Sequence, residues 1–207
     1  MLEVSCIILA GGKSLRLGYD KVFETVGEQN LLQQVISCTE TLGSEMIIVT
    51  ANEQTIPEIR DYSKLNVVTD VYPGKGPLGG IYTGLVASTS FYNLIVASDM
   101  PFLNHSLLRY MIRLSADFDL VVPRVGSLVE PLHAVYSKNC LTQIEPMIKQ
   151  DRLSVNQLFR LVKTRCIEVK EIEKFDPYHL SFFNINTETD LARARKLVKG
   201  DMSNDKC

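Results

Sequence analysis

Two adjacent glycines followed by three basic side chains form the segment of this sequence best suited to chemistry. Gly11 and Gly12 end an apolar run, and Lys13, Arg16 and Lys21 follow within nine residues. Because glycine lacks a Cβ, the backbone N–H groups of such a turn can approach a phosphate closely. The lysines and the arginine supply the opposite charge. The segment predicts a loop that binds a polyphosphate, although a glycine turn with solvated surface charges would have the same composition.

Two common phosphate-binding motifs do not fit this segment. Gly12-Lys13-Ser14 has the sequence of a P-loop ending, but Ile7 occupies the position where that motif needs its first glycine. The glycines at 11, 12 and 18 also miss the GxGxxG spacing of dinucleotide-binding folds. Both classes are therefore excluded.

The carboxylate of Asp99 is the second candidate. It follows the apolar run 94–97, and Pro101 disfavours a helical conformation for Met100. An Asp at the end of a buried strand is well placed to hold Mg²⁺, which takes one or two protein carboxylates and fills its other positions with water and phosphates. The alternative is a helix cap, but Asn104 offers a better one. We predict Asp99 as the metal ligand.

A third cluster surrounds Asp70, which ends the β-branched run 66–69. The loop 73–80 holds four glycines and two prolines in eight residues, so its backbone can close over a flat ligand. A helix expected over 79–89 would begin at Gly79 and would point the positive end of its dipole at the same ligand. An ordinary loop with a solvent-facing aspartate is the alternative.

Asn184 and Asn186 have the spacing that places two side chains on one face of a strand. They could bind a polar ligand or tie the strand end to a neighbouring loop. His133 lies in an apolar run, where a histidine is more often packed than functional. The three histidines lack metal-ligand spacing, and no GxSxG elbow supports a hydrolase triad.

Alternating β-branched runs and helical patterns predict an α/β fold with one doubly wound, mostly parallel, Rossmann-like sheet. Expected strands are 3–9, 45–50, 66–69, 93–98, 119–122, 131–136 and 165–169. Expected helices are 30–42, 53–62, 79–89, 104–115, 138–149, 154–163 and 187–198, with Asn104 and Thr187 as N-caps. In such sheets ligands bind beyond the carboxyl ends of the strands, where the first loop also lies.

The composition predicts one domain over 1–198, followed by a flexible polar tail over 199–207. A net charge of −2 argues against nucleic-acid partners, and no apolar stretch is long enough to cross a membrane or resembles a signal peptide. Five cysteines without a CxxC pair favour reduced thiols and a cytoplasmic location.

The first motif, Leu9-Ala-Gly-Gly-Lys-Ser-Leu-Arg-Leu-Gly-Tyr-Asp-Lys21, resembles the signature LAGGxSxRMGxDK of the MobA-like nucleotidyltransferases, and most closely that of their molybdenum cofactor guanylyltransferase branch. Leu17 replaces methionine, a swap of similar volume. Further matching segments lie at 70–80, 97–101, 130–136 and 184–191, so the likeness spans residues 4 to about 197. Glu188 departs from the proline of the usual NxNTP form.

The resemblance implies transfer of GMP from GTP to the terminal phosphate of molybdopterin, giving molybdopterin guanine dinucleotide and pyrophosphate with Mg²⁺ as cofactor. Transient contact with cofactor-insertion proteins or molybdoenzymes is a further expectation. The implied catalytic residues are Lys21, Arg16 and Asp99, with Asp99 as the metal ligand. The implied binding residues are Leu9, Ala10, Gly11, Gly12, Lys13, Lys21, Asp70, Gly79, Asp99, Asn184 and Asn186.

Two other functions stay open. One is a cytidylyltransferase acting on molybdopterin or on a sugar or polyol phosphate, although Gly11-Gly12 is the guanylyl pattern and cytidylyl relatives tend to carry Ala-Gly. The other is a nucleotide-binding relative without turnover. Such relatives usually lose the lysine or the metal aspartate, whereas Lys21 and Asp99 are both present here.

Overall fold

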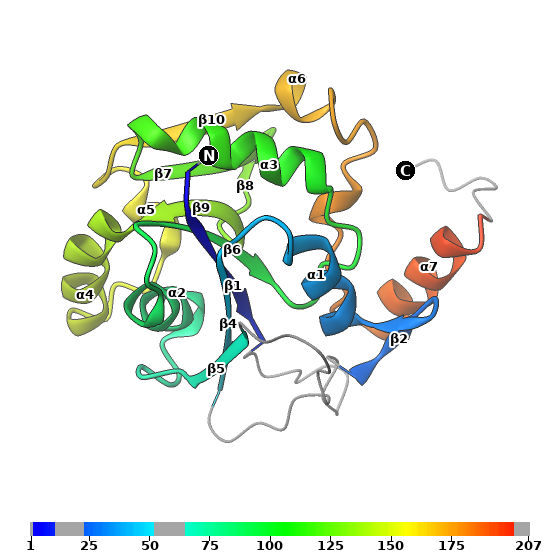
Figure 1. The fold of residues 1–207 in the computed structure, drawn as a ribbon, viewed down its shortest axis with the longest axis horizontal. Coiled ribbons are helices and arrows are strands. Elements are labelled where there is room, and N and C mark those ends of the chain that lie inside the picture. The colour runs from blue at the N-terminus through cyan, green and yellow to red at the C-terminus, as the bar shows by residue number, and fades with distance from the viewer. Residues whose placement is uncertain (1, 11–22, 52–64, 201–207) are drawn as a thin grey trace.

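The computed structural model describes residues 2–10, 23–51 and 65–200. A β-sheet lies at the centre of these residues, with helices packed around it (Figure 1). The strand order is β10-β7-β9-β6-β1-β4-β5, with β8 paired to β7. The strands are β1 (Val4–Leu9), β4 (Glu45–Thr50), β5 (Leu65–Thr69), β6 (Tyr92–Ala97), β7 (Leu120–Val125), β8 (Leu128–Val129), β9 (His133–Ser137) and β10 (Thr164–Glu168).

The sheet is mostly parallel, as the sequence predicts. Strand β1 runs parallel to β4 and β6, β4 runs parallel to β5, and β7 runs parallel to β10. Strand β9 lies antiparallel between β6 and β7. The connection from β7 to β9 covers only residues 126–132, and a parallel crossover needs a dozen residues or more, so β9 must run antiparallel to β7.

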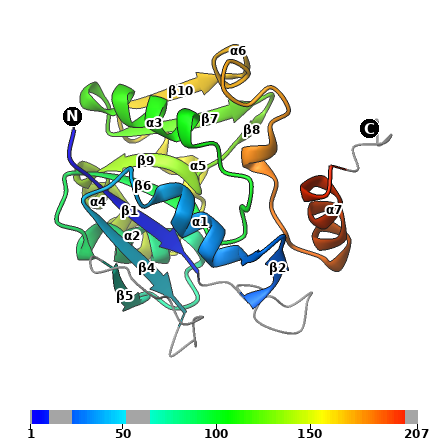
Figure 2. The ribbon, with the colours of Figure 1, turned by 45° about the vertical axis from the view of Figure 1, so that its right-hand side comes forward.

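Helices cover both faces of the sheet, which confirms the doubly wound architecture (Figure 2). On β1, Cys6 and Ile8 pack in one hydrophobic cluster and Ile7 and Leu9 in the other. The first cluster includes residues of α1 (Leu31–Thr39), α3 (His105–Leu114) and α6 (Val169–Ile172). The second includes α2 (Gly76–Ala87), α4 (Leu141–Lys149) and α5 (Val155–Leu158). All six residues of β1 are buried.

A third, smaller cluster lies beside the sheet and involves the C-terminal helix α7 (Glu188–Val198). It joins this helix to the hairpin of β2 (Thr25–Val26) and β3 (Gln29–Asn30) through Val26, Leu31, Leu191 and Ala194. The Arg195 guanidinium donates to the Thr25 carbonyl at 3.0 Å and pairs with Glu24 at 3.0 Å. Figure 1 shows α7 beside β2, away from the central sheet.

The strand order also locates the point where the connections change direction. From β1 the chain moves through β4 to β5 at one edge, and then returns to β6 on the other side of β1. A crevice outside the carboxyl ends of such strands is the usual ligand site of open α/β sheets. Here that position lies between the ends of β1 and β6.

Several predicted elements differ from the structure. The helix predicted over 154–163 is limited to α5, because the amides of Arg160 and Leu161 bond three residues back and the Thr164 hydroxyl donates to the Phe159 carbonyl. The strand predicted over 131–136 begins at His133 after a turn. Helix α2 begins at Gly76 rather than at residue 79, since Pro77 fits a helical first turn.

Other predictions are confirmed or lie outside the described residues. The Asn104 side chain caps α3 by accepting from the Leu107 amide, and Thr187 and Asp190 form a capping box on α7. The helix predicted over 53–62 and residues 201–207 lie outside the described ranges, so the flexible tail and the domain bounds stay predictions. Among the described helices, none is long and apolar enough to span a membrane.

The contact between α2 and β1 gives a test of the core. A Cβ at Gly84 would lie 2.5 Å from Cγ2 of Ile7, which is fully buried, so Gly84→Ala must displace packed atoms. We expect a loss of about 1–3 kcal/mol in the free energy of unfolding, measured by urea denaturation.

Gly80→Ala on the same helix is the matched control. Its Cβ would meet the Leu9 methyl groups at 3.4 Å, which is ordinary contact. Since alanine favours a helix by about 1 kcal/mol over glycine, this variant should be neutral or more stable than the wild type. Equal stability of the two variants would contradict the packing described for Gly84.

Candidate active site

The carboxyl ends of three neighbouring strands meet where the first basic loop begins. The Ser98 amide donates to the Leu9 carbonyl at 3.1 Å, and the Ala10 amide donates to the Val49 carbonyl at 2.8 Å. Leu9 and Ala10 are both buried. The predicted loop residues Gly11, Gly12, Lys13, Arg16 and Lys21 lie outside the described residues, but the chain enters that loop directly beside the end of β6.

Asp99 lies two residues after β6, in the turn at this crevice. It is half-buried, and its Oδ1 atom is fully buried. The backbone carbonyl of Asp99 accepts a hydrogen bond from the Ile185 amide at 3.0 Å. Two candidate segments far apart in the sequence, the end of β6 and the Asn184–Asn186 stretch, are therefore in direct contact.

The prediction that Asn184 and Asn186 lie on one strand is wrong. Residues 183–186 join no sheet, because their backbone amides bond elsewhere. The Ile185 amide bonds to Asp99, and the Asn186 amide donates to the Asp190 carboxylate at 3.0 Å. Ile185 is completely buried in the cluster shared with α7, whereas Asn184 is half-buried and Asn186 is exposed.

Asp70 directly follows β5 and is held by a side chain of α2. Its Oδ1 atom accepts from the Tyr72 amide and the Thr83 hydroxyl, both at 2.9 Å. The Thr83 hydroxyl oxygen accepts in turn from the Val71 amide at 3.0 Å. The solvent-facing alternative does not describe this carboxylate, since Asp70 is half-buried and fixes the turn onto the helix.

Gly79 lies against the same carboxylate. A Cβ at this position would be 2.7 Å from the Tyr72 carbonyl oxygen and 3.1 Å from Oδ2 of Asp70. No side chain fits there without moving the turn. Because β5 lies three strands from β6, Asp70 and Asp99 are separated by about 14 Å across the sheet. The two carboxylates therefore lie at opposite ends of the candidate site.

Asp176 is a supporting residue that the sequence reasoning missed. It is buried, and its two carboxylate oxygens accept from the Leu180 and Ser181 amides at 3.0 and 2.8 Å. The Ser181 hydroxyl accepts from the Asn104 amide at 3.0 Å, which fastens this segment to the start of α3. The Asp-Pro dipeptide at 176–177, a turn-initiating pair, was the available signal.

His133 is a packed residue, as the more common alternative for such a histidine predicts. It is fully buried on β9 opposite Val96, and its ring meets the edge of the Phe182 ring at a centroid distance of 4.9 Å. Burial lowers the pKa of His133 to about 4, against the opposing effects of Asp176 and the Ser181 backbone. The side chain is therefore neutral at pH 7 and supplies packing beneath the segment that leads to Asn184.

The buried neutral imidazole predicts a pH-dependent stability. Between pH 6.5 and pH 4 the unfolded chain protonates this histidine while the folded protein does not, so stability falls as the pH falls. From pH 7 to pH 5 the loss from this group is roughly 2 kcal/mol in the free energy of unfolding. Replacement by a non-titrating residue, His133→Leu, should reduce the difference between urea unfolding curves at the two pH values.

His105→Gln is the control for this measurement, because His105 is only half-buried and lies on α3. It should keep the pH dependence of the wild type. An unchanged pH dependence in His133→Leu would contradict the burial of a neutral His133.

Comparison with known proteins places this arrangement in a family. Residues 6–165 match the family model described as the MobA-like NTP transferase domain. A protein of Pelotomaculum thermopropionicum named "Probable molybdenum cofactor guanylyltransferase" is 34% identical over 199 residues, covering 96% of this chain and 95% of that protein. The molybdenum cofactor guanylyltransferase of Desulfosudis oleivorans is 35% identical over 203 residues, with coverages of 96% and 98%.

A solved structure agrees on the fold. The molybdopterin-guanine dinucleotide biosynthesis protein A of Archaeoglobus fulgidus superposes with a TM-score of 0.78 at 24% identity, covering 95% of this chain and 99% of that one. The family match spans the end of β1, Asp70, Gly79 and Asp99. The chain belongs to the MobA-like NTP transferase family.

Proposed function

We propose that this protein is a molybdenum cofactor guanylyltransferase, which transfers GMP from GTP to the terminal phosphate of molybdopterin and releases pyrophosphate. The observation that carries the proposal is the contact at the point where the strand connections change direction. There the Asp99 turn lies against the end of β1 through Ser98 and against the Asn184–Asn186 segment through Ile185. The names of the relatives that are about a third identical over nearly the whole chain support this reaction.

GTP would bind where β1 ends. The chain leaves the sheet at Leu9 and Ala10, and the glycines that follow allow backbone N–H groups to approach the phosphates. Lys13, Arg16 and Lys21 would neutralise the phosphate charge, with Arg16 and Lys21 acting on the reacting phosphate. The nucleoside would lie toward β5, where Asp70 can accept hydrogen bonds and where Gly79 lets the turn at Tyr72 pack closely against α2.

Mg²⁺ fits this site through Asp99. Within the described residues no group of three His, Cys, Asp or Glu side chains could hold a metal ion. Magnesium is commonly held by one or two carboxylates together with substrate phosphates, and Asp99 provides one such carboxylate at the crevice. When bound, Mg²⁺ would supply charge neutralisation at the phosphate oxygens.

The acceptor would approach from the side of Asn184 and Asn186. Its terminal phosphate is already an anionic nucleophile near neutral pH, so the reaction requires no strong general base. The neutral, fully buried His133 is consistent with this, because it lies beneath the site rather than in it. Transient contacts with cofactor-insertion proteins or molybdoenzymes and a cytoplasmic location stay predictions.

Nucleotide choice can be tested by thermal unfolding with each of the four nucleoside triphosphates, with and without Mg²⁺. A ligand that binds only the folded state raises its stability by about 2.7 kcal/mol at 100 times its Kd. We expect GTP with Mg²⁺ to give the largest rise in Tm. A rise with CTP alone would contradict guanylyl transfer and favour the cytidylyl alternative.

Catalysis can be tested by pyrophosphate release from GTP in the presence of molybdopterin. Asp99→Asn removes the proposed metal charge and should lower kcat roughly 10²- to 10³-fold, as loss of one preorganised electrostatic contact typically does. Asp117→Asn is the matched control, since Asp117 is exposed in the short 3-10 turn that follows α3. Normal turnover in Asp99→Asn would remove Asp99 from the reaction.

A further inference from the structure

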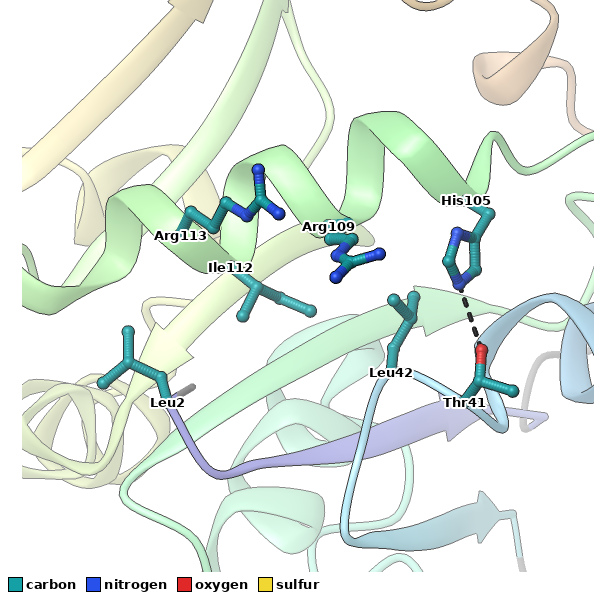
Figure 3. Close-up of a pocket in the computed structure, with 7 residues that line it drawn as sticks. All are labelled: Leu2, Thr41, Leu42, His105, Arg109, Ile112 and Arg113. Atoms are coloured by element: carbon teal, nitrogen blue, oxygen red, sulfur yellow. Dashed lines mark hydrogen bonds between the residues drawn. The ribbon is translucent and has the colours of Figure 1, made fainter.

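A cavity of about 350 Å³ lies beneath α3, outside the candidate active site. It is bounded by α3, by Leu2 just before β1, and by Thr41 and Leu42 in the connection before β4 (Figure 3). Leu2 lies just before β1, whose six residues span about 20 Å from one end to the other. None of the residues that line the cavity belongs to the candidate site at the carboxyl ends of the strands.

The floor of this cavity is apolar. Leu2, Leu42 and Ile112 line it, and Figure 3 shows the side chain of Ile112 directed from α3 toward the loop that carries Leu42. Leu2 remains 38% exposed. The volume lies within the range of pockets that bind small molecules, which are mostly apolar with a few polar groups.

The rim is cationic and has no counter-charge. Arg109 and Arg113 line the cavity from successive turns of α3, and both are exposed. In the part of the chain that the structure describes, neither guanidinium makes an ion pair or hydrogen bond, and no acidic residue lines the cavity. Like charges four residues apart on a helix destabilise it, so an anion bound between them would relieve an unfavourable contact.

One end of the cavity is held in place by a side-chain hydrogen bond. The Nε2 atom of His105 lies 3.0 Å from the Thr41 hydroxyl and joins the start of α3 to the connection before β4 (Figure 3). The two sides of the cavity are therefore linked directly, and its shape is present before any ligand arrives. A preformed site reduces the entropy that a small ligand must overcome on binding.

We propose that this cavity binds a small, freely diffusing amphipathic anion, with a phosphate or carboxylate between Arg109 and Arg113 and an apolar portion over Leu2, Leu42 and Ile112. Guanidinium groups bind both headgroups in bidentate geometry. The apolar floor selects against inorganic anions, which cannot use it. The proposal is independent of the proposed transferase reaction, because none of its residues belongs to that site.

The test uses n-hexyl phosphate and heptanoate as probes, followed by amide chemical shifts of the full-length protein. Amides around Leu42 and Ile112 should shift on titration, and inorganic phosphate should bind there at least tenfold more weakly. Arg109→Ala should weaken binding about tenfold, the loss expected for one charge-assisted hydrogen bond. Leu2→Ser should also weaken the binding of n-hexyl phosphate, while the affinity for inorganic phosphate should stay unchanged.

Arg160→Ala is the matched control, because Arg160 is exposed at the end of α5 and lines no part of the cavity. It should bind the probes as the wild type does. Equal affinity of the Arg109→Ala/Arg113→Ala double variant and the wild type would overturn the proposal. So would equal binding of hexylamine, or sedimentation with phosphatidylserine vesicles that depends on both arginines while the free probes fail to bind.

Discussion

The parallel register between β1 and β6 is the constraint on which the candidate site depends. Leu9 pairs with Ala97, and Ser98, the residue directly after β6, donates its amide to the Leu9 carbonyl. This pairing ends both strands at the same level, so Ala10 and the Asp99 turn leave the sheet side by side. A slip of one residue would turn every side chain of the strand to the other face. The burial of both faces of β1 makes such a slip costly, because charged or polar neighbours would replace core residues.

A second set of contacts brings the C-terminal segment to that point. Asp176 holds the amides of Leu180 and Ser181, and Ser181 bonds to Asn104 at the start of α3. Ile185, buried in the cluster shared with α7, then bonds to the Asp99 carbonyl. Because these anchors lie before and within the segment, the stretch from Ser181 to Asn186 has little freedom to move away from the crevice. The acceptor side of the proposed site is built by tertiary contacts rather than by the sheet.

The sequence predicted the strand ends more accurately than the segment at 184–186, and the reason is physical. Strand β6 carries a continuous apolar run, so its end and the position of Asp99 follow from local composition. The asparagines have a strand-like spacing, but the amide of Ile185 bonds to Asp99 and the amide of Asn186 bonds to Asp190, which no local pattern reveals. The antiparallel direction of β9 follows from the short connection between β7 and β9, not from the composition of the strand itself. The hydrogen bond from Thr83 to Asp70 joins residues 13 positions apart, so no local sequence pattern indicated it.

The two candidate aspartates are joined to the fold at different points. Asp70 uses Oδ1 to hold the Tyr72 amide and the Thr83 hydroxyl, and Gly79 lies against its other oxygen. A change at Asp70 therefore disturbs both the turn and any bound nucleoside. Asp99 is joined to Ile185 through its backbone carbonyl, which Asp99→Asn retains. A kinetic change in an Asp70 variant would consequently combine a displaced turn with a lost ligand contact, so stability must be measured beside turnover to separate the two effects.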